Sequence, residues 1–324
     1  MANSLEVPAK IYVRMGQLAE EAGAVRDLAG IAGIDVVGAD RSGECAEYEA
    51  VATEMLGTLT ELYSNVGMPL KGRYKVIVSD RPLRTWGNPE FIQKRDFGKH
   101  SGHPFFSSKG AEGYDGCIFI YLPGVKAEAD KWERHIGAGP SQPHGQGELP
   151  GGMMGPMLLW TMAHESAHAL QSENMKDIND RGNIVAVEGL AAFFQDVVLR
   201  NAGFGLVDRL NGYERRPLGE AFDNNSMPSQ LNEMITRYDD GKRGEVSSHV
   251  KDVIAWASDG VKNRGDAYIV GSALFTAVYL SEGKSLKRTL SMALGAKTTE
   301  DVLGMAEQAA AKLSRTMKKS KGAD

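Results

Sequence analysis

Cysteine, long apolar runs and excess basic charge are all scarce in this chain of 324 residues. Its two cysteines, Cys45 and Cys117, are too few for a disulfide scaffold and form no Cys-x-x-Cys pair. Two free thiols are therefore expected, with a single bridge as the alternative. No apolar run reaches the length of a membrane span. The net charge of -5 gives no basic patch of the kind that nucleic acid or an anionic membrane requires, so we expect neither as a partner.

A secretion signal is also missing from the sequence as it stands, because no basic segment followed by an apolar one opens it. This leaves the compartment open: cytoplasmic by default, and periplasmic or secreted if a signal has been removed. The residues are 42% hydrophobic and 24% charged, which fits one large globular domain or two intimate ones. The oligomeric state is open.

Hydrophobic periodicity predicts an α+β fold that is mainly helical. Residues 15–32 and 43–63 repeat small and apolar side chains at helical spacing, and residues 74–78 and 116–122 are short β-branched runs that predict two strands of one sheet. Residues 81–115, between these strands, are predicted to form a long loop.

Further along the chain, residues 137–155 are rich in glycine and proline and are predicted to be irregular. The remaining helices are expected over residues 156–172, 183–200, 229–238, 246–258, 266–280, 285–294 and 298–317. The sequence thus predicts helices plus a small sheet in residues 1–135 and a helical half in residues 136–324, which together form one catalytic unit.

A histidine and glutamate motif interrupts the apolar segment LLWTMAHESAHALQ, residues 158–171. Positions four apart lie on the same face of a helix, so His164 and His168 can present two ring nitrogens to one metal ion. Glu165 projects from the neighbouring side, where it can reach a metal-bound water without being a ligand. This is the His-Glu-x-x-His pattern of zinc metalloproteases, and it predicts Zn²⁺ as the cofactor. The alternative is two histidines that face solvent or are satisfied in the core.

A third ligand is needed, because a catalytic zinc takes three protein ligands and keeps one position open for water. Glu188 lies twenty residues after His168, inside the next expected helix, and has apolar neighbours in Val187 and Leu190. We therefore interpret Glu188 as the third metal ligand. The alternative for it is an exposed helix carboxylate.

The combination of His164-Glu165-x-x-His168, a spacer of nineteen residues and Glu188-Gly189-x-Ala191 resembles the gluzincin zinc metallopeptidases. It is most similar to the M1-like, peptidase MA-like branch. The resemblance implies a zincin-like catalytic domain, with His164, His168 and Glu188 as zinc ligands and Glu165 as the general base. It also implies a tyrosine that stabilises the oxyanion within a Tyr-x-x-Gly pattern.

Tyr268 matches that last expectation in Tyr268-Ile-Val-Gly271, with a purely structural tyrosine as the alternative. Two features of the families are missing. The segment 151–155 lacks the glutamate with which M1 aminopeptidases grip a free amine, which favours an endopeptidase. The acid that thermolysin-like enzymes carry four residues after the third ligand is replaced by Ala192.

Other polar residues remain open as helpers of the site. Asp196 lies one turn beyond Ala192, and Asp177 or Asp180 is an alternative partner for a ligand histidine. The remaining histidines are His100 and His103, interpreted as loop residues, and His144 and His249, which are candidates for substrate contact.

The sequence therefore predicts a zinc metallopeptidase that acts on a peptide or protein substrate. In this hypothesis zinc polarises a water, Glu165 takes its proton, and the resulting nucleophile attacks the peptide carbonyl. Two alternatives stay open: a non-catalytic zinc-binding interaction protein with a degenerate peptidase fold, and a zinc hydrolase of a non-peptide amide.

Overall fold

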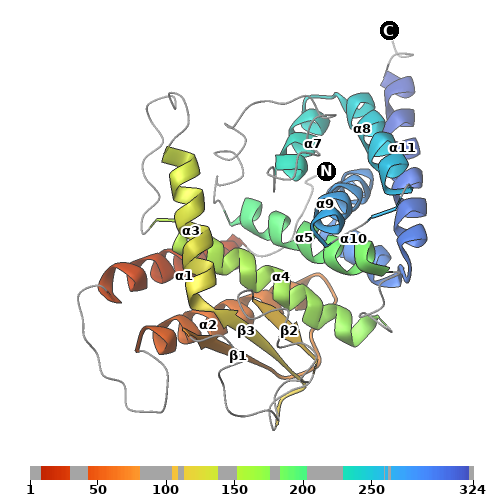
Figure 1. The fold of residues 1–324 in the computed structure, drawn as a ribbon. Coiled ribbons are helices and arrows are strands. Elements are labelled where there is room, and N and C mark those ends of the chain that lie inside the picture. The colour runs from red at the N-terminus through yellow and green to blue at the C-terminus, as the bar shows by residue number, and fades with distance from the viewer. Residues whose placement is uncertain are drawn as a thin grey trace. The chain divides into compact units, whose positions relative to one another are not determined.

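The structure is a computed structural model that describes residues 9–29, 43–80, 104–108, 113–137, 152–175, 183–202, 229–258, 260–261 and 264–320. Over these residues the chain is mainly helical with a small three-stranded mixed sheet, which confirms the predicted α+β class (Figure 1). Within the same residues, every helix is too short or too polar to cross a membrane.

Contacts divide the chain into two compact units, one that ends at Glu173 and one that begins at Asn174, with a short return to the first at Asn201. We call them the sheet unit and the helical unit. The predicted grouping of residues 1–135 and 136–324 into one catalytic unit stays a prediction.

The sheet unit contains all three described strands and the helix that carries the motif. Its elements are α1 (Ala9–Ala29), α2 (Gly43–Asn65), β1 (Tyr74–Ser79), β2 (Phe105–Ser107), β3 (Gly116–Tyr121), α3 (Leu122–Gly137) and α4 (Met154–Asn174). The strand order is β1-β3-β2. β1 runs parallel to β3, with Tyr74 opposite Gly116, and β2 is antiparallel to β3, with Phe106 opposite Ile118. α1 packs on α2, which in turn packs on β1.

Two elements of this unit differ from the sequence prediction. β2 lies within residues 81–115, which were predicted to be a loop, because a three-residue strand is too short to show a period and depends on its pairing with β3. α3 was not predicted; it begins at Leu122, the residue with which the predicted second strand ends. The start of α4 at Met154 also shortens the irregular stretch predicted before residue 156.

The helical unit contains the helices that the sequence predicts after residue 183, each within a few residues of its expected bounds. They are α5 (Ile184–Asn201), α7 (Ser229–Asp239), α8 (Arg243–Ser258), α9 (Arg264–Ser281), α10 (Leu286–Gly295) and α11 (Thr299–Ser320). The predicted start of the last helix is confirmed by a cap: Asp301 N–H donates to Thr298 Oγ1 at 3.1 Å, and Asp301 Oδ2 accepts from the backbone N–H of Thr298 at 3.0 Å.

α5 and α9 cross at two glycines. A Cβ atom on Gly189 would lie 2.3 Å from Gly271 Cα, and one on Gly271 would lie 2.1 Å from Gly189 Cα. The backbones therefore touch, which only glycine at both positions allows. A buried hydrogen bond of 3.0 Å from Ser272 Oγ to Asp196 Oδ2 joins the same two helices.

Candidate metal centre

The motif helix α4 is buried along almost its whole length. From Met154 to Gln171 only Trp160 and His164 are partly exposed. A helix that is apolar all round belongs in the interior of its unit. α1 approaches α4 closely at Gly155, where an added Cβ would collide with the carbonyl oxygen of Ala19. Packing of this density holds the motif side chains in fixed positions.

His164 and His168 direct their ring nitrogens at one another, as their spacing of four residues predicts. The two Nε2 atoms are 3.2 Å apart, and the rings meet edge to face at 84°. His168 is buried with 8% of its surface exposed, whereas His164 is partly exposed. Two Nε2 atoms so close to each other could provide two of the ligands of a metal ion.

Three buried hydrogen bonds hold His168 and the nearby Ser166 within the sheet unit. Gln171, one turn after His168, places its Oε1 2.7 Å from His168 Nδ1. Ser166 Oγ donates to the carbonyl of Ala163 at 3.0 Å and lies 3.1 Å from the hydroxyl of Tyr63 on α2. Burial raises the pKa of Tyr63, so its hydroxyl keeps its proton and donates it to Ser166.

The C-terminal end of α4 is fixed by Glu173. Its carboxylate accepts the backbone N–H groups of Lys71 and Gly72, the latter at 2.7 Å, and the hydroxyl of Tyr74 at 2.5 Å. Burial and the neighbouring Glu173 raise the pKa of Tyr74, which keeps this hydroxyl a donor. The end of α4 is thereby tied to the start of β1.

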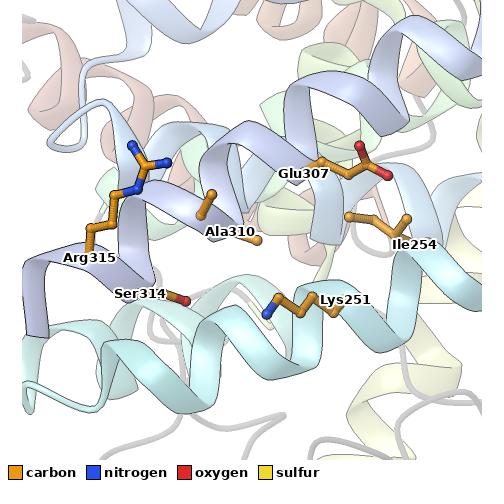
Figure 2. Close-up of a pocket in the computed structure, with 7 residues that line it drawn as sticks. Lys251, Ile254, Glu307, Ala310, Ser314 and Arg315 are labelled. Carbon is orange, nitrogen blue, oxygen red and sulfur yellow. The ribbon is translucent and has the colours of Figure 1, made fainter. Parts of the chain in front are cut away.

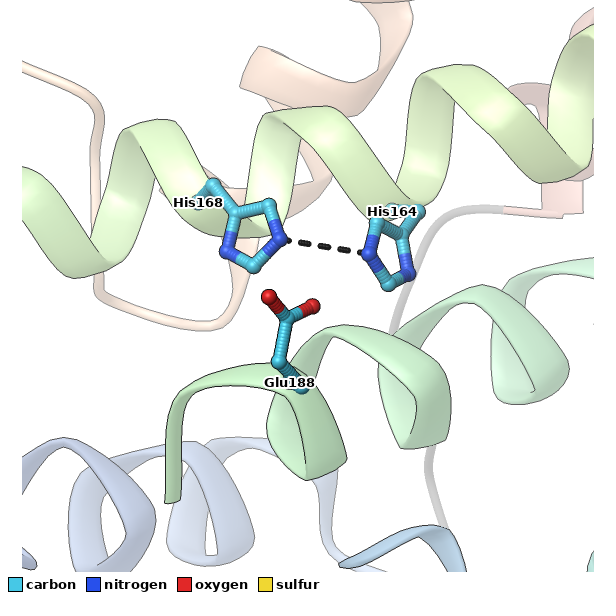
Figure 3. A group of neighbouring side chains, drawn as sticks. All are labelled: His164, His168 and Glu188. Atoms are coloured by element: carbon cyan, nitrogen blue, oxygen red, sulfur yellow. Dashed lines mark hydrogen bonds between the residues drawn. The ribbon is translucent and has the colours of Figure 1, made fainter. Parts of the chain in front are cut away.

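Glu188, the third predicted ligand, lies on α5 and is buried with 3% of its surface exposed. The ligand atoms of His164, His168 and Glu188 all lie within 4.8 Å of one another, and the carboxylate faces the two rings in Figure 3. Glu165, the predicted base, is also buried, at 6% exposure, and follows His164 on α4. The structure thus brings together the three residues that the sequence selects as metal ligands.

The donor set fits a zinc ion. A tetrahedral ion with bonds of about 2.05 Å holds its ligand atoms about 3.3 Å apart, and the two histidine nitrogens already have this spacing at 3.2 Å. The ligand atoms of all three residues lie within 4.8 Å of one another, so the Glu188 carboxylate lies near the two nitrogens. Two imidazoles with one carboxylate are ligands that zinc prefers, although cobalt, iron and nickel accept them too.

Tyr268 and Asp196 both lie in the helical unit, on α9 and α5. Tyr268 is partly buried and comes one turn before Gly271, where α9 touches α5 beside Glu188. Asp196 accepts the hydroxyl of Ser272, so it joins α5 to α9. Ala192, at the position of the missing acid, is buried.

The remaining sequence candidates fall into two groups. His249 is buried in α8, where burial lowers the pKa to about 4; the nearby Arg237 charge also lowers it, and Asp252 opposes both. The others lie outside the described residues: His100, His103, His144, Asp177 and Asp180.

Three residues of this region were not selected from the sequence. Gln171 closes the same apolar segment that contains the motif, and a buried amide one turn past a ligand histidine was a usable signal. Gly189 and Gly271 belong to the quoted motifs, but a glycine in a sequence does not show which backbone it will meet.

A groove of about 470 Å³ lies between α8 and α11 in the helical unit (Figure 2). It is lined by Lys251, Ile254, Glu307, Ala310, Ala311, Ser314 and Arg315. None of the predicted site residues lines it, and its single carboxylate among two cations provides no metal-ligand set.

In comparisons with known proteins, no protein-family model, no curated protein and no solved structure matches the chain.

Proposed function

We propose that the chain is a zinc-dependent metallopeptidase with a gluzincin-type, zincin-like catalytic domain. His164, His168 and Glu188 hold the zinc ion, and Glu165 is the general base. The observation that carries the proposal is the buried group itself: two Nε2 atoms 3.2 Å apart, with the carboxylate of Glu188 within 4.8 Å. Three such groups with an adjacent glutamate on the helix are what a catalytic zinc requires.

Glu165 is the part of this set that distinguishes catalysis from metal storage. It is buried and directly follows a ligand, so on a helix it is rotated by about 100° from His164 and does not share that ligand's direction. A purely structural zinc needs no such base and is more often closed by a fourth protein ligand.

The residues divide the work of hydrolysis as follows. Zinc, when bound, supplies a Lewis acid that lowers the pKa of water and polarises the substrate carbonyl. The Glu165 carboxylate accepts a proton from the attacking water and then delivers it to the amide nitrogen, which leaves as an amine. The Tyr268 hydroxyl donates a hydrogen bond to the developing oxyanion.

The proposed substrate is a peptide or protein that is cleaved internally. An aminopeptidase needs an anionic side chain that binds the free amine of the substrate. The motif segment 151–155, where that glutamate is expected from the resemblance, contains none.

The test combines metal content with proteolysis on four purified proteins: wild type, Glu165→Gln, His168→Ala and, as a control, Glu61→Gln, which alters an exposed carboxylate on α2. Zinc is measured by mass spectrometry after dialysis, and cleavage is profiled with a broad peptide library. We expect one zinc per chain in all but His168→Ala. We expect cleavage to fall by about 10² to 10⁴-fold in Glu165→Gln and to stay at the wild-type level in Glu61→Gln.

Each other outcome has a defined meaning. If the wild type does not bind zinc or a related divalent ion, the metal centre is refuted. If it binds zinc and cleaves no peptide, peptidase activity is refuted, and assays on simple amides then separate a non-peptide hydrolase from a zinc-binding interaction protein.

A further inference from the structure

Gln171 makes a hydrogen bond that determines which ring nitrogen of His168 carries the proton before any metal binds. Its side chain is fully buried, and its Oε1 lies 2.7 Å from His168 Nδ1. An amide oxygen can only accept a hydrogen bond, so His168 Nδ1 is the donor and carries a proton. In a neutral imidazole the other nitrogen then has none. His168 Nε2 therefore offers a lone pair, in the direction of His164 Nε2 at 3.2 Å.

The pair of Nε2 atoms fits this assignment. A contact of 3.2 Å between two ring nitrogens needs one donor and one acceptor. With His168 Nε2 as the acceptor, His164 supplies the N–H. Donation thus runs in a single direction along α4, from His164 to His168 and from His168 to Gln171.

The hydrogen-bond partner of His168 comes from the same helix. Partners of ligand histidines are usually carboxylates, backbone carbonyls or water. Here the partner lies three residues after the ligand on the same helix, where side chains at that spacing are neighbours. The hydrogen bond at His168 Nδ1 is therefore made within α4. Because the partner is a neutral amide, it adds no negative charge beside the metal ligands.

We propose that Gln171 is a positioning residue that holds His168 in the Nδ1–H tautomer, with Nε2 unprotonated and ready to bind the metal. The metal in this statement rests on the proposed function, whereas the tautomer belongs to the metal-free chain. The pairing also predicts the converse tautomer, Nε2–H, for His164 before metal binds.

The tautomer can be read directly by NMR. The full chain is labelled with ¹⁵N in its histidines, freed of metal and kept at a pH where imidazole is neutral. Long-range ¹H–¹⁵N correlations separate protonated from unprotonated ring nitrogens, and His168→Asn identifies the signals of that residue. We expect a protonated Nδ1 and an unprotonated Nε2 for His168. A wild-type His168 with its proton on Nε2 overturns the proposal without the need for any variant.

Two substitutions at Gln171 then test its role. Gln171→Leu removes the acceptor and is expected to move His168 toward the Nε2–H tautomer that free imidazole prefers. Gln171→Glu keeps an acceptor oxygen and is expected to preserve the Nδ1–H form. Zinc affinity, measured by competition with a chelator, should fall 10- to 100-fold in Gln171→Leu and be restored in Gln171→Glu.

The outcomes distinguish a failure of the Gln171 proposal from a failure of the proposed function. Circular dichroism confirms that each variant is folded before its affinity is compared. If the tautomer is as expected and the wild type binds no metal, the proposed function fails while the assignment of the tautomer stands. If a folded Gln171→Leu keeps both the wild-type tautomer and the wild-type affinity, Gln171 is not the positioning residue.

Discussion

Substitution of Gly271 by alanine tests how closely α5, the helix that carries Glu188, is held within its unit. A Cβ at this position would lie 2.1 Å from Gly189 Cα on α5 and 3.0 Å from the carbonyl oxygen of Val185. Carbon atoms in contact are about 3.5–4.0 Å apart, so the two backbones must separate by roughly 1.5 Å. Neither obstacle is a side chain that can rotate away.

The expected cost follows from this geometry. Overpacking a core costs about 1–3 kcal/mol, and a clash between backbones belongs at the upper end of that range. Alanine recovers about 1 kcal/mol through its better helix propensity. We therefore expect Gly271→Ala to lower the free energy of unfolding by about 2 kcal/mol or more. At about 2–4 °C per kcal/mol for a unit of this size, the midpoint falls by at least 4 °C or so.

The assay is urea and thermal unfolding followed by circular dichroism at the helical band. Gly304→Ala is the matched control, because Gly304 lies in α11 of the same unit and an added Cβ there meets nothing within 4 Å. The control should be neutral or slightly stabilising. A Gly271→Ala protein as stable as its Gly304→Ala counterpart would refute the argument that α5 and α9 touch through their backbones.

Two further predictions concern a buried histidine of α8 and the anchor at the end of α4. The pKa of buried His249 is lowered from 6.5 to about 4, so the unfolded chain takes up a proton first as the pH falls through that window, and stability falls with it. Between pH 7.5 and 4.5, the free energy of unfolding of His249→Gln, measured with urea, should therefore fall by about 2–3 kcal/mol less than that of the wild type. Equal decreases in the two proteins would contradict the lowered pKa of His249. Glu173→Gln removes the charge that accepts the Tyr74 hydroxyl and two backbone N–H groups, so it should destabilise the fold by about 1–3 kcal/mol. Glu61→Gln, on the exposed face of α2, should change stability by less than about 0.5 kcal/mol, and a similar value for Glu173→Gln would show that the anchor is unimportant.

The sequence by itself predicted the helices of the helical unit and selected the three candidate ligands that lie close together in the structure. The helices of the helical unit follow from periodicity over ten or more residues, which is a local property of the chain. His164 and His168 share a helix, so their common direction also follows from a spacing of four residues. Glu188 could be selected because an acid among buried apolar positions needs a partner.

Only the tertiary structure decided which groups these residues meet. β2 exists through its pairing with β3, and no local pattern marks it. Gly189 and Gly271 lie in different helices, so their contact depends on the crossing of α5 and α9. The hydrogen bond from His168 to Gln171 depends on side-chain rotamers that packing around α4 selects. Spacing along the chain thus fixes which side chains share a direction, and packing fixes the partner that each of them finds.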